Sequence, residues 1–242
     1  MSKRIVCWFS CGAASAVATI LAAVKYGEIE AVYCRVVEEH EDNLRFLDDF
    51  TRVTGIPVKV IMDEPSQGSI YNIFVKRGFL KNQYGAPCTM ILKKDMRKSY
   101  QRPDDIQILG YTVEEQDRAD RFIDGNNDVN EDFILIDNKV TKQDCYDHLR
   151  RLGLDLPAMY KLGYSNNNCI GCVKGGDGLL EQDSKGFSRT IRQDGKDGTV
   201  YWSRNQQRQK RCGVFGRTRP SSGTAKRRHA RRLWVYLRGQ RC

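Results

Sequence analysis

The chain has 242 residues, with 40 lysines and arginines against 30 aspartates and glutamates, which gives a formal net charge of +10. Hydrophobic residues make up 40% and charged residues 29% of the sequence, a balance that excludes a wholly disordered chain. No apolar run approaches the roughly 20 residues of a membrane-spanning helix. The length suits one or two domains with a buried core, and we expect a cytoplasmic protein without membrane contact.

The positive charge is confined to the end of the chain. Residues 177–242 carry 17 basic and 5 acidic side chains, with no acid from Arg204 onward, whereas residues 1–176 carry 23 basic and 25 acidic side chains. A basic surface would indicate a polyanionic partner such as a nucleic acid. The net charge is therefore a property of the tail and says nothing about the rest of the chain.

The hydrophobic pattern of residues 1–176 alternates between strands and helices. Short apolar runs predict strands over residues 4–9, 29–37, 58–62, 106–111 and 134–137. Apolar residues at helical spacing predict helices over residues 15–27, 42–54, 88–100 and 141–152. This alternation predicts an α/β fold with a doubly wound, mostly parallel sheet, followed by an irregular basic tail.

Small residues fill the turn between the first predicted strand and helix: Ser10, Cys11, Gly12, Ala13, Ala14 and Ser15. Doubly wound sheets bind ligands beyond the carboxyl ends of their strands, so this turn is the first candidate site. Backbone amides at the start of the following helix could approach a phosphate there. It is not a Walker loop, because no lysine lies within it. An ordinary tight turn is the alternative interpretation.

The cysteines suggest metal binding or redox chemistry more than disulfides in a cytoplasmic protein. Cys169 and Cys172 form a C-x-x-C turn between asparagines and glycines, a loop that packs poorly as core and suits a metal or a redox pair. Cys7, Cys34 and Cys145 lie in predicted strands and a helix, so we interpret them as small buried hydrophobic residues.

Five segments, in order along residues 4–176, resemble segments of one known family. Residues 10–17 resemble the S-G-G-x-D-S-x-V loop of the ATP pyrophosphatase (PP-loop) superfamily. Residues 87–89 with Lys93, residues 110–118, residues 134–152, and residues 160–164 before the C-x-x-C resemble segments of its phosphoadenosine phosphosulfate reductase branch. The chain is similar to phosphoadenosine phosphosulfate reductase-like proteins often found in bacteriophage genomes, which implies a Rossmann-like, adenine nucleotide alpha hydrolase-like fold and, if phage-encoded, a place in the bacterial host cytoplasm.

The resemblance implies an adenine nucleotide, ATP or phosphoadenosine phosphosulfate, bound by the turn of residues 10–15, the end of the second strand at residues 37–39 and the loop at Gly110. Arg118 and Arg121 are then candidate phosphate or sulfate clamps, with a solvated helix face as the alternative. Two positions depart from the family loop, since Ala14 stands where Asp is usual and Cys11 where Gly is usual.

The resemblance also implies that Cys88, Cys169 and Cys172 act together as catalytic residues and as ligands of a 4Fe-4S cluster with one open iron. A zinc site completed by His148 or water, and three unliganded thiols, are the alternatives. The function expected first is reduction or transfer of sulfur from an adenylyl-activated substrate, with a thiol as electron donor. The alternatives are an ATP-dependent, cluster-dependent sulfurtransferase that modifies a nucleic acid, and a non-catalytic nucleotide- or metal-binding module.

The resemblance stops after Gly176. Relatives continue as K-G-G-M-G-Y-W-N-K-I-R-K-D-F, and permitted codons for residues 177–187, read from their second base, encode M-G-Y-W-N-K-I-R-K-D-F. We therefore divide the chain into a domain over residues 1–176 and a tail over residues 177–242 that is out of frame and poorly ordered. A basic nucleic-acid-binding extension centred on residues 226–232 is the alternative.

Overall fold

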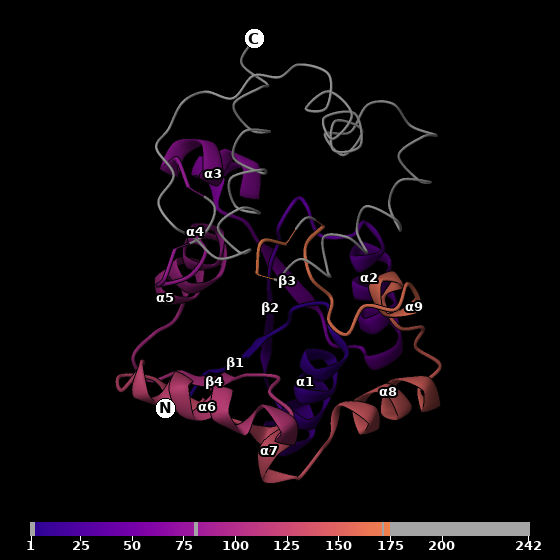
Figure 1. The fold of residues 1–242 in the computed structure, drawn as a ribbon. Coiled ribbons are helices and arrows are strands. Elements are labelled where there is room, and N and C mark those ends of the chain that lie inside the picture. The colour runs from indigo at the N-terminus through magenta and orange to yellow at the C-terminus, as the bar shows by residue number, and fades with distance from the viewer. Residues whose placement is uncertain (1–2, 80–81, 171, 175–242) are drawn as a thin grey trace.

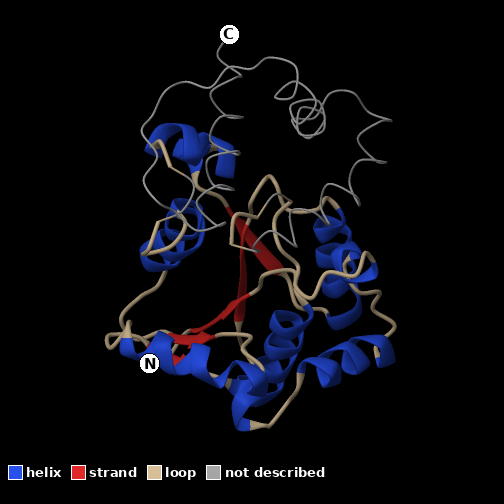
Figure 2. Cartoon of the chain, viewed as in Figure 1, coloured by secondary structure: helices blue, strands red, loops and turns tan. Residues whose placement is uncertain are grey.

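The computed structural model of the chain describes residues 3–79, 82–170 and 172–174. Within them, five strands form one all-parallel sheet in the order β3-β2-β1-β4-β5 (Figure 2). The strands are β1 (Ile5–Trp8), β2 (Glu30–Cys34), β3 (Val58–Ile61), β4 (Ile106–Ile108) and β5 (Asn130–Asp132). The α/β prediction is confirmed, the sheet is consistent with a Rossmann-like fold, and the strand order reverses between β1 and β4.

Helices cover both sides of this sheet (Figure 1). On one side lie α1 (Ala13–Tyr26), α2 (Asp42–Thr54), α8 (Lys142–Arg151) and α9 (Ala158–Lys161). On the other lie α4 (Pro87–Thr89) and α5 (Met96–Tyr100), joined by the π-helical turn η2 (Met90–Asp95). The described residues also form α3 (Ile70–Arg77), α6 (Gln116–Asp124), α7 (Ile134–Asp137) and the 3-10 turns η1 (Glu64–Ser66) and η3 (Val113–Glu115).

The side chains of β1 alternate between two packing environments. Cys7 joins a large core with residues of α1, α2 and α8, whereas the ring of the next residue, Trp8, meets Tyr100 of α5 edge to face at 6.0 Å between centroids. In the large core Phe9 packs on Phe50 at 4.7 Å between ring centroids. Each fully buried side chain of this size contributes about 1.5–3 kcal/mol of hydrophobic stabilisation, so this core fixes the strands relative to α1 and α2.

A second, smaller core lies around α3 and η2. Its buried residues are Val36, Ile70, Ile73, Phe74 and Leu92. Cys88 and Cys169, which are 81 positions apart in the sequence, both pack against it. This core therefore brings two of the predicted site cysteines to one place.

Helix α2 has the bounds that the sequence predicted. Asp42 stands in its first turn, where a carboxylate complements the helix dipole, and Gly55 ends it with a φ of 72° that favours glycine. The predicted helix over 141–152 is also present as α8, whose N-cap Thr141 and Asp144 form a capping box.

The prediction of a strand over residues 134–137 was wrong, because these residues form α7. A four-residue apolar run has no decisive period, and here Ile136 N donates to Phe133 O and Asn138 Nδ2 to Ile134 O, closing a helical turn. The fifth strand is instead the polar run of β5, an edge strand beside β4. The predicted helix over 88–100 is divided into α4, η2 and α5.

The predicted tail, residues 177–242, lies outside the described residues, and so does the predicted domain boundary at residue 176. In the part of the chain that the structure describes, no helix is both long and apolar enough to cross a membrane.

Candidate functional site

The 10–15 loop follows β1 at the point where the strand order reverses. Cys11 adopts a φ of 53°, an uncommon left-handed conformation for a residue other than glycine, and α1 begins two residues later. The Ser15 hydroxyl donates to Gly12 O at 2.9 Å and accepts from Ser10 N at 3.0 Å. These bonds close the loop on itself over the first turn of α1.

The loop that follows β4 packs directly against the 10–15 loop. A Cβ atom at Gly110 would lie 2.6 Å from Ser15 Cα and 2.7 Å from Ser15 N. Real Cβ atoms do not approach backbone so closely, so only glycine fits at this position. The structure thus brings together the Gly110 loop and the 10–15 loop, which the resemblance assigns to one pocket.

A buried carboxylate, Glu39, stands beside the loop. Its side chain is only 3% exposed and accepts from Tyr33 Oη at 2.5 Å, from Asn43 Nδ2 at 3.1 Å and from Lys93 Nζ at 3.0 Å. The charge of Glu39 raises the pKa of Lys93. Because π-helical turns often occur at functional sites, the position of Lys93 on η2 is notable.

The three predicted site cysteines lie on the other side of Glu39. The thiol of Cys169 is 3.9 Å from Glu39 Oε1, and burial raises its pKa, as do the charges of Glu39, Cys172 and Cys88. Burial, followed by the charge of Cys172, also raises the pKa of Cys88. The positive charge of Lys93 lowers the pKa of both Cys88 and Cys169. The three thiols are therefore close enough to influence one another.

The structure does not group these cysteines as ligands of a single metal ion. Among residues 3–79, 82–170 and 172–174, no three Cys, His, Asp or Glu side chains are arranged to hold a metal ion. His148, the alternative zinc ligand, lies on α8, across the sheet from Cys88 on α4 (Figure 1). The predicted iron-sulfur cluster and the zinc alternative both stay predictions.

The predicted arginine clamps lie on α6. The guanidinium of Arg118 stacks over the Tyr111 ring at 4.4 Å and donates to Glu115 at 2.6 Å, while Arg121 is exposed one turn further along. Burial lowers the pKa of Lys174, and the charges of Arg118 and Lys94 lower it further. The charges of Cys172 and Cys88 act in the opposite direction on the pKa of Lys174.

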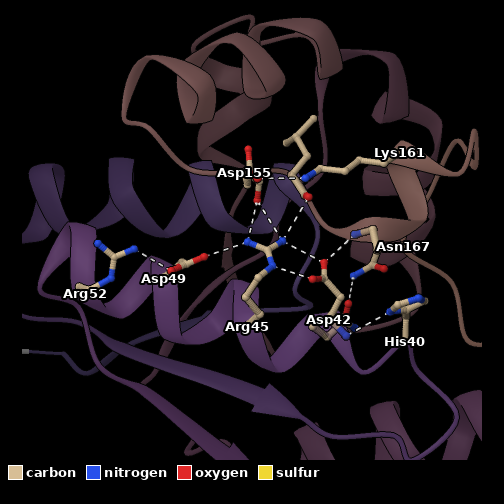
Figure 3. Close-up of polar contacts among 11 residues, drawn as sticks. His40, Asp42, Arg45, Asp49, Arg52, Asp155, Lys161 and Asn167 are labelled. Atoms are coloured by element: carbon tan, nitrogen blue, oxygen red, sulfur yellow. Dashed lines mark hydrogen bonds and ion pairs between the residues drawn. The ribbon is translucent and has the colours of Figure 1, made fainter.

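A polar network fixes the C-terminal part of the described chain to the start of α2 (Figure 3). Asp42 accepts from Ala158 N at 2.7 Å and from Arg45 Nε at 2.6 Å. Arg45 also donates to the backbone carbonyls of Asp155 and Leu156. The segment leading to α9 is thereby held in place.

The segment of residues 165–170 reaches the 10–15 loop from there. Asn167 Nδ2 donates to Cys11 O and to Asn43 Oδ1, both at 2.8 Å, and Ile170 N donates to Glu38 O at 2.8 Å. From α9, the Tyr160 hydroxyl accepts from Ala13 N at 3.3 Å. The segment that leads into the C-x-x-C thus contacts the 10–15 loop.

Sequence reasoning found only part of this arrangement. The resemblance placed Glu39 in the expected pocket, within residues 37–39, but gave it no partners, and Asn167 was interpreted only as one of the asparagines beside the C-x-x-C. Lys93 was noticed through the family resemblance, without a partner. The hydrogen bonds of Glu39 to Tyr33, Asn43 and Lys93 had no signal in the sequence.

An open cavity elsewhere belongs to a different part of the molecule. It is lined by Lys25, Tyr26 and Asp132 among others, at the edge of the sheet beside β5. Asp132 is already bound there by Lys25 at 2.7 Å and Tyr26 at 2.5 Å. None of the predicted site residues lines it.

No protein-family model matches the chain, and no curated protein matches it either. Function must therefore be inferred from the site itself.

Proposed function

We propose that the chain binds an adenine nucleotide, ATP or phosphoadenosine phosphosulfate, at the 10–15 loop and performs sulfur chemistry with the adjoining cysteines. The observation that supports this most is the contact of Gly110 with Ser15, which packs two loops together at the strand reversal. Doubly wound sheets bind nucleotides at that point. The reaction class is the one implied by the resemblance to phosphoadenosine phosphosulfate reductase-like proteins, namely reduction or transfer of sulfur from an adenylyl-activated substrate.

The start of α1 suits a phosphate group. The helix is 14 residues long, its N-cap Gly12 has no capping side chain, and its first turn holds no acid. The helix dipole places about half a positive charge at this end. A phosphate oxygen could replace the Tyr160 hydroxyl as the acceptor for Ala13 N, and backbone amides supply this binding without the Asp that Ala14 replaces.

The positive groups near the cysteines suit a second phosphate or a sulfate. Arg118 would turn its guanidinium from Glu115 to the ligand, and Lys94 and Lys174 would add positive charge. The negative charge of the ligand would relieve the repulsion that these cations exert on one another. Arg121 is close enough along α6 to assist at the exposed rim.

The cysteines would supply the sulfur chemistry. A thiol must lose its proton to act as a nucleophile, and burial raises the pKa of Cys169, whereas the charge of Lys93 lowers it. We propose that Lys93 provides the positive charge that makes thiolate formation possible, with an external thiol as electron donor. We assign no step to an iron-sulfur cluster or zinc, because the described cysteines are not placed as a set of three metal ligands.

A non-catalytic nucleotide-binding module is the second candidate. It is favoured by Ala14, which removes the acid that PP-loop enzymes usually carry for metal-assisted cleavage of ATP. An ATP-dependent sulfurtransferase acting on a nucleic acid would use the same nucleotide pocket and differ in its acceptor.

Titration calorimetry of the full chain with ATP and with adenosine 3′,5′-bisphosphate tests the proposal. We expect binding of at least one of them, and its absence for both would refute the nucleotide site. Assays for release of adenosine 3′,5′-bisphosphate from phosphoadenosine phosphosulfate and of pyrophosphate from ATP would then separate the reductase from the sulfurtransferase. Binding without either product would support the non-catalytic module.

A further inference from the structure

Asn167 connects two parts of the site that are far apart in sequence. Its Nδ2 group donates to the Cys11 carbonyl of the 10–15 loop and to Asn43 Oδ1 on α2. Asn43 in turn donates to Glu39, the buried carboxylate between the loop and the cysteines. One side-chain amide thus reaches both the loop and the Glu39 network.

Asn167 bonds to the residue of the 10–15 loop with the uncommon backbone conformation, Cys11. Cys11 is fully buried and has a φ of 53°, a conformation that a residue with a side chain keeps only where its surroundings impose it. The hydrogen bond to the Cys11 carbonyl is such a constraint, and it comes from 156 positions along the chain.

Asn167 is also close in sequence to the C-x-x-C. Cys169 lies two residues beyond Asn167, and Ile170 N donates to Glu38 O at 2.8 Å. Cys169 is half-buried and packs against the second core, so a displacement of this segment changes the exposure of its thiol. Displacement of one part should therefore loosen the other.

We infer that Asn167 is a positioning residue that couples the 10–15 loop to the C-x-x-C, so that the state of the loop controls access to Cys169 and Cys172. This inference rests on the proposed function for the identity of the ligand. The coupling itself exists in the protein without ligand, because both contacts are made there. Coupling is reciprocal, so a ligand that orders the loop also protects the thiols.

Alkylation by iodoacetamide, followed at each cysteine by mass spectrometry, measures the coupling in the full chain. Asn167→Asp keeps the shape of the side chain and removes its N–H donors. We expect it to speed alkylation of Cys169 by about tenfold, within the usual range of coupling between sites. The matched control is Asn166→Ala, since Asn166 is exposed and its side-chain amide bonds to Lys142 and Ser165, away from the 10–15 loop.

Saturating ATP supplies the second arm. In the wild type it should slow alkylation of Cys169 and Cys172 by about tenfold, and in Asn167→Asp this protection should be lost. Unchanged alkylation in Asn167→Asp without ligand, or equal protection by ATP in both proteins, would overturn the inference. If the wild type binds neither ATP nor adenosine 3′,5′-bisphosphate, the proposed function fails, while the comparison without ligand still decides the coupling.

Two further measurements guard against general unfolding. Cys145 is buried in the large core and should stay unreactive in every variant that remains folded. If Asn167→Asp exposes Cys145, the experiment uses Ser15→Ala instead. This substitution loosens the 10–15 loop by removing the hydrogen bonds of the Ser15 hydroxyl to Ser10 N and Gly12 O. Faster alkylation of Cys169 in Ser15→Ala supports the coupling, and a wild-type rate there refutes it.

Discussion

Gly110→Ala tests the packing on which the proposed pocket depends. The new methyl group would lie 2.6 Å from Ser15 Cα, so the two loops must separate by roughly 0.8 Å to reach an ordinary 3.4 Å contact. The atoms it meets are backbone at the start of α1, which cannot rotate away. Overpacking of this kind costs about 1–3 kcal/mol in the free energy of unfolding.

Gly125→Ala is the matched control. Gly125 follows α6 with a φ of −95°, and a Cβ there would come no nearer than 3.4 Å to Arg121 O. Where a glycine position tolerates a side chain, the change to alanine raises the free energy of unfolding by about 0.4–1 kcal/mol, because the unfolded chain loses conformational freedom. The two substitutions should therefore act in opposite directions.

Urea unfolding followed by far-ultraviolet circular dichroism measures the stability difference, and titration calorimetry with ATP measures the effect on the pocket. We expect Gly110→Ala to lower the urea midpoint and to weaken ATP binding at least about tenfold, since backbone shifts near a ligand have large effects. Equal stability and equal ATP affinity in Gly110→Ala and Gly125→Ala would refute both the close contact and its role in binding.

Two further substitutions and one reading of the gene test other parts of the molecule. Lys93→Met should lower the free energy of unfolding by about 1–3 kcal/mol in urea, because it removes the cation from buried Glu39, and wild-type stability would contradict the ion pair. Burial raises the pKa of Asp105, but the hydrogen bonds from Arg4 and the nearby positive charges together outweigh burial and lower the pKa overall. The ionised carboxylate therefore stabilises the fold above about pH 4, and this stabilisation is lost as the pH falls further. In Asp105→Asn, the urea midpoint should fall less between neutral and acid pH than in the wild type. In the gene, the codons of residues 177–242 read from their second base should form an open reading frame that encodes the continuation seen in the relatives. Stop codons in that frame would reject the frameshift.

The sequence predicted the parts of the fold that have strong local signals. Helix α2 combines an apolar face, an acid at its start and a glycine at its end, and its bounds were predicted correctly. The run 134–137 has only four residues, and the polar strand β5 carries no apolar pattern, so their types depended on neighbours that the sequence does not show. Tertiary contacts decided both.

The site was predictable where a motif carried it and unpredictable where long-range contacts did. The small residues of the 10–15 loop and the spacing of the C-x-x-C are visible in the sequence, and the resemblance pointed to Gly110. The bond from Asn167 to Cys11 spans 156 positions, and an asparagine in a polar loop has no pattern that would reveal its partner. Such contacts exist only once the chain has folded.

Glu39 shows why this site could be sensitive to charge as well as to position. A buried carboxylate is costly unless donors surround it, and here β2, α2 and η2 each provide one. Burial raises the pKa of Cys11 and of Cys169, one thiol in each of the two coupled segments, and the charge of Glu39 raises both further, whereas Lys93 lowers both. Removal of Lys93 should therefore raise both pKa values and slow alkylation, whereas loss of the Asn167 contact should expose the thiols and speed it. Because the two changes act in opposite directions on the same thiols, alkylation rates separate electrostatic control from positional control.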